Sequence, residues 1–113
     1  MNKVVIDALK NVGAPVSFQE YTGSATTYIT FFFYNEKGVF HAENEELATG
    51  HSLQVDIWST GNYSSLVKEV KTRMNATGFT RTFAADLYEE PSGSTQKARI
   101  FHKALRFRYT EFV

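Results

Sequence analysis

The sequence predicts an α+β fold, with a mainly antiparallel sheet of about four to five strands and two helices packed on one face. Three observations lead to this prediction. Several segments alternate apolar and polar residues with the two-residue period of a strand. Two other segments repeat apolar residues every three or four positions, as amphipathic helices do. The length of 113 residues suits one hydrophobic core, so residues 1–113 are expected to form a single domain.

Composition narrows the class of protein. Twelve basic and twelve acidic residues give a formal net charge of zero, which argues against a dedicated nucleic-acid binder. The aromatic share of 15% is high and favours a β-rich protein that associates with others. The chain has no cysteine, which excludes disulfides and thiolate metal sites. It also shows no signal-peptide pattern and no apolar run near the roughly 18–20 residues that span a bilayer, so we expect a soluble cytoplasmic protein.

The first third of the chain is expected to contain a short helix and the most β-like strand. Residues 4–12 carry an apolar stripe at helical spacing, and Gly13 and Pro15 end it. Residues 16–21 form a short extended piece. Residues 26–34, TTYITFFFY, are β-branched and aromatic and apolar on both faces. Such a run indicates either a central strand or a strand whose outer face is covered by another subunit.

A turn and an acidic loop are predicted next. Residues 35–38, NEKG, have the composition of a hairpin turn, with a return strand beginning at residue 39. Glu43, Glu45 and Glu46 then form an acidic cluster in a loop that runs to Gly50. A cluster of this kind is usually a solvated loop, although it can also contact a neighbouring molecule.

Residues 53–78 are the best-defined stretch, a strand followed by a helix. Apolar residues alternate with polar ones from residue 53 to residue 57, and Trp58 closes the strand. Asn62 is the expected N-cap of the helix, and Gly78 is expected to end it in the left-handed conformation. Trp58 is either an exposed interface anchor or packed over the start of this helix, and both interpretations stay open.

Two more strands complete the predicted sheet. Residues 79–88 alternate, with Phe79, Arg81, Phe83, Ala85 and Leu87 expected on one face. Residues 89–96 contain proline, glycine and serine and are predicted to be an exposed loop. Residues 97–109 form the closing strand. Its expected core face holds Phe101, Leu105, Phe107 and Tyr109, and its other face holds His102, Ala104, Arg106 and Arg108.

No motif for catalysis or cofactor binding is present. The chain lacks GxSxG, Walker and GxGxxG patterns, and its three histidines have no zinc-site spacing. We therefore expect no enzyme, no metal and no cofactor.

The basic closing strand supports an alternative function, nucleic-acid binding. Its cations, interleaved with aromatic residues, are Arg99, Lys103, Arg106 and Arg108. The balanced charge argues against this, as does the placement of the strand's own aromatics on the core face. The favoured interpretation is a solvated strand in which Arg106 and Arg108 pair with acids such as Asp56 or Asp86. Lys103, on the apolar face, is expected at a sheet margin with its stem buried and its amine reaching water.

Three segments together resemble one protein family. They are QVDIWSTGNYSSLVKEVKTRM, GFTRTFAADLYEE and KARIFHKALRFRYTEF. From about Thr26 to the C-terminus the chain is similar to the small tail-completion proteins of long-tailed bacteriophages and prophages, the tail-terminator or head-to-tail joining proteins.

The resemblance implies an assembly role rather than a reaction. Family members form a ring, usually sixfold, on the head-proximal end of the tail tube in the virion, after assembly in the host cytoplasm. Expected partners are further copies of the chain, the tail-tube protein, the connector proteins of the head, and DNA only as it crosses the channel, with no membrane. The alternative within the same setting is a different small head- or tail-completion protein. The candidate contact residues, chosen from exposure signals and not from a family motif, are Glu43, Glu45, Glu46, Trp58, Glu89 and Glu90.

Overall fold

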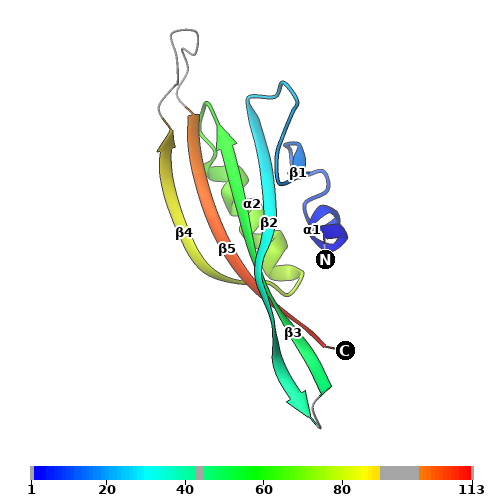
Figure 1. The fold of residues 1–113 in the computed structure, drawn as a ribbon. Helices are drawn as coiled ribbons and strands as arrows, with labels where there is room; N and C mark the ends of the chain where they lie inside the picture. The colour runs from blue at the N-terminus through cyan, green and yellow to red at the C-terminus, as the bar shows by residue number, and fades with distance from the viewer. Residues whose placement is uncertain (1, 43–44, 90–99, 113) are drawn as a thin grey trace.

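The computed structural model of the chain describes residues 2–42, 45–89 and 100–112, with side chains defined outside 35–47, 88–89 and 112. Its elements, in chain order, are α1 (Asn2–Ala8), β1 (Val16–Phe18), β2 (Thr27–Ala42), β3 (Glu45–Ser59), α2 (Ser64–Ala76), β4 (Thr80–Glu89) and β5 (Ile100–Phe112). The strands form one five-stranded sheet in the order β1-β2-β3-β5-β4 (Figure 1). Every pairing is antiparallel except that of β1 with β2. The predicted α+β fold is therefore confirmed.

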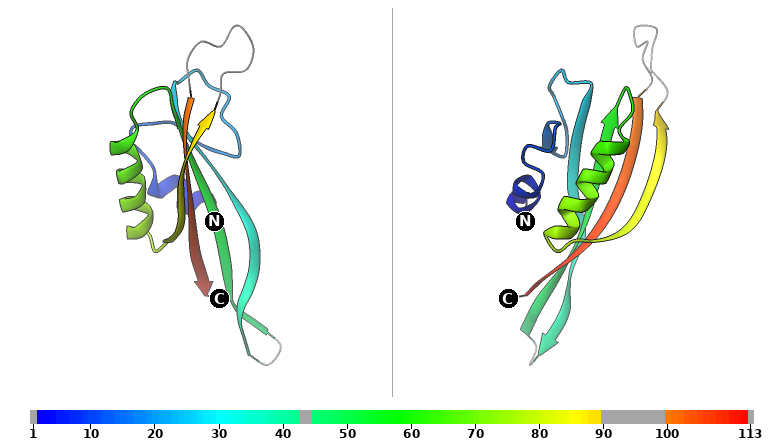
Figure 2. Two further views of the ribbon diagram at one scale, coloured as in Figure 1. Left: turned by 90° about the vertical axis from the view of Figure 1, so that its left-hand side faces the viewer. Right: turned by 180° about the vertical axis from the view of Figure 1, so that it is seen from behind.

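Both helices lie on the same side of the sheet (Figure 2). The hydrophobic core lies between the helices and the sheet. The alternation predicted for β2 and β3 determines which side chains enter this core. The fully buried ones from the sheet include Ile29, Phe31, Leu53, Val55, Ile57, Leu105 and Phe107. They belong to the same core as Val5 of α1, Leu9 directly after α1, and Val67, Val70 and Met74 of α2. Each large apolar side chain buried in this way contributes roughly 1.5–3 kcal/mol relative to exposure.

The start of α2 lies close to the predicted position. The Oδ1 atom of Asn62 accepts a hydrogen bond from the Ser64 amide at 2.9 Å. The N-cap position itself is Tyr63, so the predicted cap residue lies one position further out. Asn62 still satisfies one of the amide groups that the first turn leaves without a helical partner.

The end of α2 is confirmed in detail. Gly78 has a φ of 104°, in the left-handed region. Its amide donates to the Asn75 carbonyl at 3.0 Å, and the Phe79 amide donates to the Met74 carbonyl at 3.0 Å. These two bonds are those of a Schellman motif. Phe79 and Met74 are both buried, so the motif also directs the chain from the helix into β4.

The segment between β2 and β3 differs from the prediction. Residues 35–38 are not a turn, because β2 continues to Ala42 and β3 begins at Glu45. The register shifts between Tyr34 and Lys37 and again near Phe40, so the irregular residues are accommodated as bulges within the strand. The predicted acidic loop is likewise wrong from residue 45 onward, since residues 45–50 are part of β3.

These long strands form a projecting ribbon that we call the arm, residues 35–42 and 45–50. It extends past the helices and past the start of β4 (Figures 1 and 2). The radius of gyration is 16.0 Å, with extents of 59 × 27 × 23 Å. A compact chain of this length would have a radius of gyration of about 13 Å. The molecule is therefore elongated along the direction of the arm.

A bulge in β4 also overturns the predicted faces of that strand. Arg81 is opposite Phe107, but Phe83 is opposite Arg106, so Thr82 is an extra residue between them. Phe79 and Arg81 consequently lie on the helix side, whereas Phe83 and Leu87 lie on the other side. Phe83 is 43% exposed and Leu87 45% exposed. The predicted single face of five residues does not exist.

Candidate functional site: the open face of the sheet

The side of the sheet opposite the helices carries no helix within the described residues, and we call it the open face (Figure 2). The strand registers align its side chains in four rows across β2, β3, β5 and β4. In that strand order the rows are Tyr28, Trp58, His102, Leu87; Thr30, Asp56, Ala104, Ala85; Phe32, Gln54, Arg106, Phe83; and Tyr34, Ser52, Arg108, Thr80. Large side chains dominate the first and third rows, and a row of smaller ones lies between them.

A polar network lies within this face. Asp56 and His102 are 5% and 6% exposed, and an Asp56 Oδ1 atom lies 2.6 Å from His102 Nε2. Gln54 donates to both carboxylate oxygens of Asp56, at 3.0 and 3.2 Å. Arg106 Nε in turn donates to Gln54 Oε1 at 3.1 Å. Because buried polar groups must be paired, this chain of bonds fixes the positions of its members.

The aromatic residues of the face stack in a line. Tyr21 stacks on Tyr28 with centroids 4.5 Å apart, and Tyr28 lies 6.1 Å from Trp58. Trp58 lies flat on His102, with centroids 3.8 Å apart and planes inclined by 12°. Its Nε1 atom donates to Thr30 Oγ1 at 3.2 Å. Trp58 is thus half-buried on the open face, and the interpretation that placed it over the start of α2 is wrong.

Arg106 is held between aromatic rings. Its guanidinium carbon lies 5.5 Å from the centre of the Tyr34 ring and 5.1 Å from that of Phe83, which is within cation–π range. Arg108 is exposed in the next row of the same face. The expected pairing of Arg106 with Asp56 or Asp86 is not made, since Arg106 reaches Asp56 only through Gln54. The solvent-exposed charge of the described open face is therefore positive.

Lys103 belongs to the other side of the sheet. It is opposite Ile57, its side chain is 16% exposed, and its Nζ donates to Asp86 Oδ2 at 3.1 Å. The Tyr63 hydroxyl donates to the other Asp86 oxygen at 2.9 Å. Hydrogen bonds from Tyr63 and Lys103 lower the pKa of Asp86. Burial is the main cause that raises the pKa of Tyr63 to about 12, and the hydrogen bond to Asp86 is the second cause. The predicted buried stem of Lys103 is confirmed, but the predicted position at a sheet margin is wrong, because β5 lies between β3 and β4 and Lys103 is opposite Ile57 on one side and Asp86 on the other.

The four cations of the nucleic-acid alternative are thus not on one surface. Arg106 and Arg108 share the open face, Lys103 lies on the helix side, and Arg99 lies outside the described residues. Glu43 and Glu90 also lie outside them. Glu45, Glu46 and Glu89 are placed only by their backbones, in β3 and at the end of β4.

The aromatic partners of the site were not predicted as functional residues, although Tyr28, Phe32 and Tyr34 were expected on the face opposite Ile29, Phe31 and Phe33, as the structure has them. Tyr28, Phe32 and Tyr34 are half-buried on the open face, together with the exposed Phe83 and Leu87. The signal for the first three was the segment apolar on both faces, which left open whether the outer face was covered. No sequence signal revealed the bulge that turns Phe83 and Leu87 outward.

Among the residues whose side chains the structure describes, no three His, Asp or Glu side chains converge as a metal site would require. Within the same residues no helix is long and apolar enough to cross a membrane. No family model matches the chain, and the search of curated proteins also gave no match.

Proposed function

We propose that the protein is a structural assembly protein, a tail-completion protein of a long-tailed bacteriophage or prophage. It assembles as a ring, sixfold by the family resemblance, on the head-proximal end of the tail tube. There it stops polymerisation of the tube and joins the tail to the connector proteins of the head. Its action is protein–protein association, without a reaction or a cofactor.

The observation that carries this proposal is the open face. One whole side of the sheet presents aromatic side chains, an arginine held between rings and two exposed apolar residues, Phe83 and Leu87. Aromatic residues and arginine are the types most enriched in the energetic centres of protein interfaces. The segment of β2 that is apolar on both faces also supports the proposal, because one of the two interpretations of its sequence was a strand whose outer face is covered by another subunit.

The network beneath the rings supports an interface that is ready to bind. Asp56, Gln54 and Arg106 hold one another through hydrogen bonds, and Trp58 is fixed between His102 and Thr30. Side chains fixed in this way lose little conformational entropy on association, so more of the contact energy contributes to binding. In a finished phage the protein is expected in the virion at the head-proximal tail end, and in the host cytoplasm during assembly.

Deletion of the gene from the phage that carries it tests the proposal. After induction, negative-stain electron microscopy of the lysate should show filled heads beside unjoined tails, some of them abnormally long. Supply of the intact gene in trans should restore joined particles. Intact virions at normal yield without the gene would refute the proposal, and heads that had lost their DNA would indicate a head-completion protein instead.

A second function, nucleic-acid binding, is favoured by one observation. Arg106 lies between Tyr34 and Phe83 on the same face as Arg108, so cations and aromatic rings do share a surface, although not through the aromatics of β5. Electrophoretic mobility with single-stranded and duplex DNA over a salt series distinguishes it. Tight binding whose affinity falls steeply with salt would support this function. Arg108→Ala should then reduce the slope of log affinity against log salt concentration by about one.

A further inference from the structure

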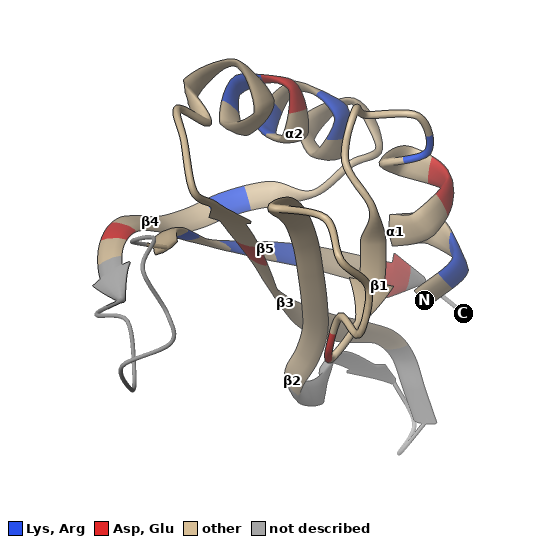
Figure 3. Cartoon of the chain, turned by 90° about the horizontal axis from the view of Figure 1, so that it is seen from above, with Lys and Arg blue, Asp and Glu red and all other residues tan. Residues whose placement is uncertain are grey.

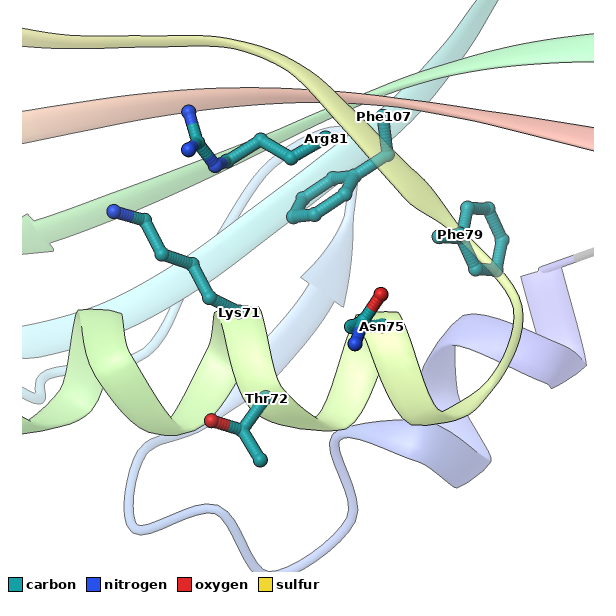
Figure 4. Close-up of a pocket in the computed structure, with 6 residues that line it drawn as sticks. All are labelled: Lys71, Thr72, Asn75, Phe79, Arg81 and Phe107. Atoms are coloured by element: carbon teal, nitrogen blue, oxygen red, sulfur yellow. The ribbon is translucent and has the colours of Figure 1, made fainter.

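A second surface, on the helix side, has the properties of a docking groove. It is a cavity of about 330 Å³ between α2 and the edge strand β4, lined by Lys71, Thr72, Asn75, Phe79, Arg81 and Phe107 (Figure 4). The phenylalanine rings come from the core beneath, where Phe79 is 1% and Phe107 2% exposed. The charged ends of Lys71 and Arg81 extend in the same direction from α2 and β4.

The positive charge of this groove is not neutralised locally. Within the described part of the chain, neither Lys71 nor Arg81 forms a salt bridge. Lys71 contributes to the lowered pKa of Asp86, but the two oxygens of Asp86 already accept hydrogen bonds from Tyr63 and Lys103. Figure 3 shows further basic residues along α2 above the sheet. The phenylalanine rings beneath are almost fully buried, so the two cations determine the chemistry of the groove, and they favour an anionic occupant.

Backbone groups are available beside the groove as well. Within the described residues β4 pairs only with β5, so its other edge carries unpaired amide and carbonyl groups. Such an edge accepts an extended segment of another chain. The groove and the edge together therefore fit an acidic, extended segment better than a small anion.

The chain itself carries a segment of this kind. The arm carries three glutamates, Glu36, Glu45 and Glu46, and one lysine, Lys37. It is supported by β5 only as far as the pair of Ala48 and Phe112, and beyond that pair the described residues of β2 and β3 pair only with each other. A two-stranded ribbon is marginally stable in water unless it packs on something. The arm extends away from α2 and β4, so its own groove is out of reach (Figures 1 and 2).

We propose that the arm of one copy docks in the groove of the next copy, with its acidic end against Lys71 and Arg81. The two contacting surfaces differ, so the contact is heterologous, and a rotation that closes would generate a ring. This inference rests on the self-association part of the proposed function and gives that association a specific contact.

Cross-linking of the full-length protein tests it, because the natural chain has no cysteine. A chain with Asn75→Cys in the groove is mixed with a tagged chain carrying Ala42→Cys in the arm, and mixed disulfide dimers are measured on oxidation. The matched control is Ser65→Cys, exposed on the same helix but outside the groove. We expect the groove cysteine to form the mixed dimer about tenfold faster than the control, because docking raises the local concentration of the two thiols.

Charge reversal makes the test specific. Lys71→Glu with Arg81→Glu in the groove chain, or Glu45→Lys with Glu46→Lys in the arm chain, should each slow the cross-link about tenfold. Combining both reversals should restore it, which a misfolded chain could not do. Lys10→Glu with Lys68→Glu, exposed cations outside the groove, should leave it unchanged.

Equal rates at Asn75→Cys and Ser65→Cys, or no recovery when both reversals are combined, would overturn the inference. The outcome is separable from that of the gene deletion. Unjoined tails without the specific cross-link would refute the docking alone. A specific cross-link with normal virions would refute the tail role and leave the docking of copies in place.

Discussion

Replacement of Gly78 by alanine should destabilise the protein, because this residue directs the chain from α2 into β4. Its φ of 104° is a conformation that residues with a Cβ atom rarely adopt. A Cβ atom at this position would also lie 3.3 Å from Cε2 of Tyr109, closer than most such contacts. Tyr109 packs on Phe79, with ring centroids 4.8 Å apart, so a shift of its ring would disturb the core where β4 begins.

The magnitude follows from three glycines that differ in these two features. The left-handed backbone costs a residue with a Cβ atom roughly 1–2 kcal/mol. Alanine recovers about 0.4–1 kcal/mol by restricting the unfolded chain. Gly13 has a φ of 106° and no atom within 4 Å of the place that a Cβ atom would occupy, so Gly13→Ala should cost about 1 kcal/mol through the backbone alone. Gly78→Ala adds the contact with Tyr109 and should cost about 1.5–3 kcal/mol.

Gly61 is the matched control, with no strained φ and open space at the Cβ position. Gly61→Ala should be neutral or slightly stabilising. Urea unfolding at neutral pH measures all three variants, and each kcal/mol should also shift the thermal midpoint by roughly 4–5 °C. An unfolding free energy for Gly78→Ala equal to that for Gly61→Ala would refute the reasoning about this helix end.

Two further predictions concern the polar clusters. His102→Phe keeps a ring against Trp58 but removes the His102 nitrogen that lies 2.6 Å from the buried Asp56 carboxyl oxygen. The free energy of unfolding, measured in urea, should therefore fall by about 2–4 kcal/mol. A loss below about 1 kcal/mol would show that the pair contributes little to stability. In an absorbance titration the Tyr63 phenol should ionise near 12 instead of 10.0, and Asp86→Asn should lower this pKa only in part, because burial is the larger cause. Between these pH values the unfolded tyrosine has lost its proton while the folded one retains it, so stability should fall as pH rises. The lowered pKa of Asp86 acts at the other end, where stability should fall as pH drops below 3.8, and Asp86→Asn should remove that dependence.

Local patterns in the sequence were sufficient where each residue's environment depends on its own element. The alternation in residues 53–58 correctly placed Leu53, Val55 and Ile57 in the core. The spacing of apolar residues predicted the helix that follows. The left-handed conformation of Gly78 was predicted because helices commonly end on a glycine in that conformation. The conformation of these segments is determined by interactions a few residues apart.

Features that depend on pairing between distant strands were not predictable in this way. The polar residues 35–38 have a composition typical of a turn, but a bulge has the same composition, and only the pairing of β2 with β3 distinguishes them. The bulge at Thr82 reverses the faces of β4 beyond it, and nothing in an alternating sequence indicates where alternation fails. The open face was missed for a related reason, since a segment apolar on both sides does not show which side the helices cover.

We propose that the open face binds a protein partner during assembly of the phage tail, and substitutions on that face test this directly. Phe83→Glu with Leu87→Glu places two charges on that face at positions already exposed, and Ile6→Glu, on α1 and 44% exposed, is the matched control. The measurement is the yield of joined particles when each variant, shown to fold by circular dichroism, complements the gene deletion. We predict that the double variant leaves unjoined tails while Ile6→Glu restores normal yield. Normal yield from the double variant would contradict the assignment of the open face as the assembly surface.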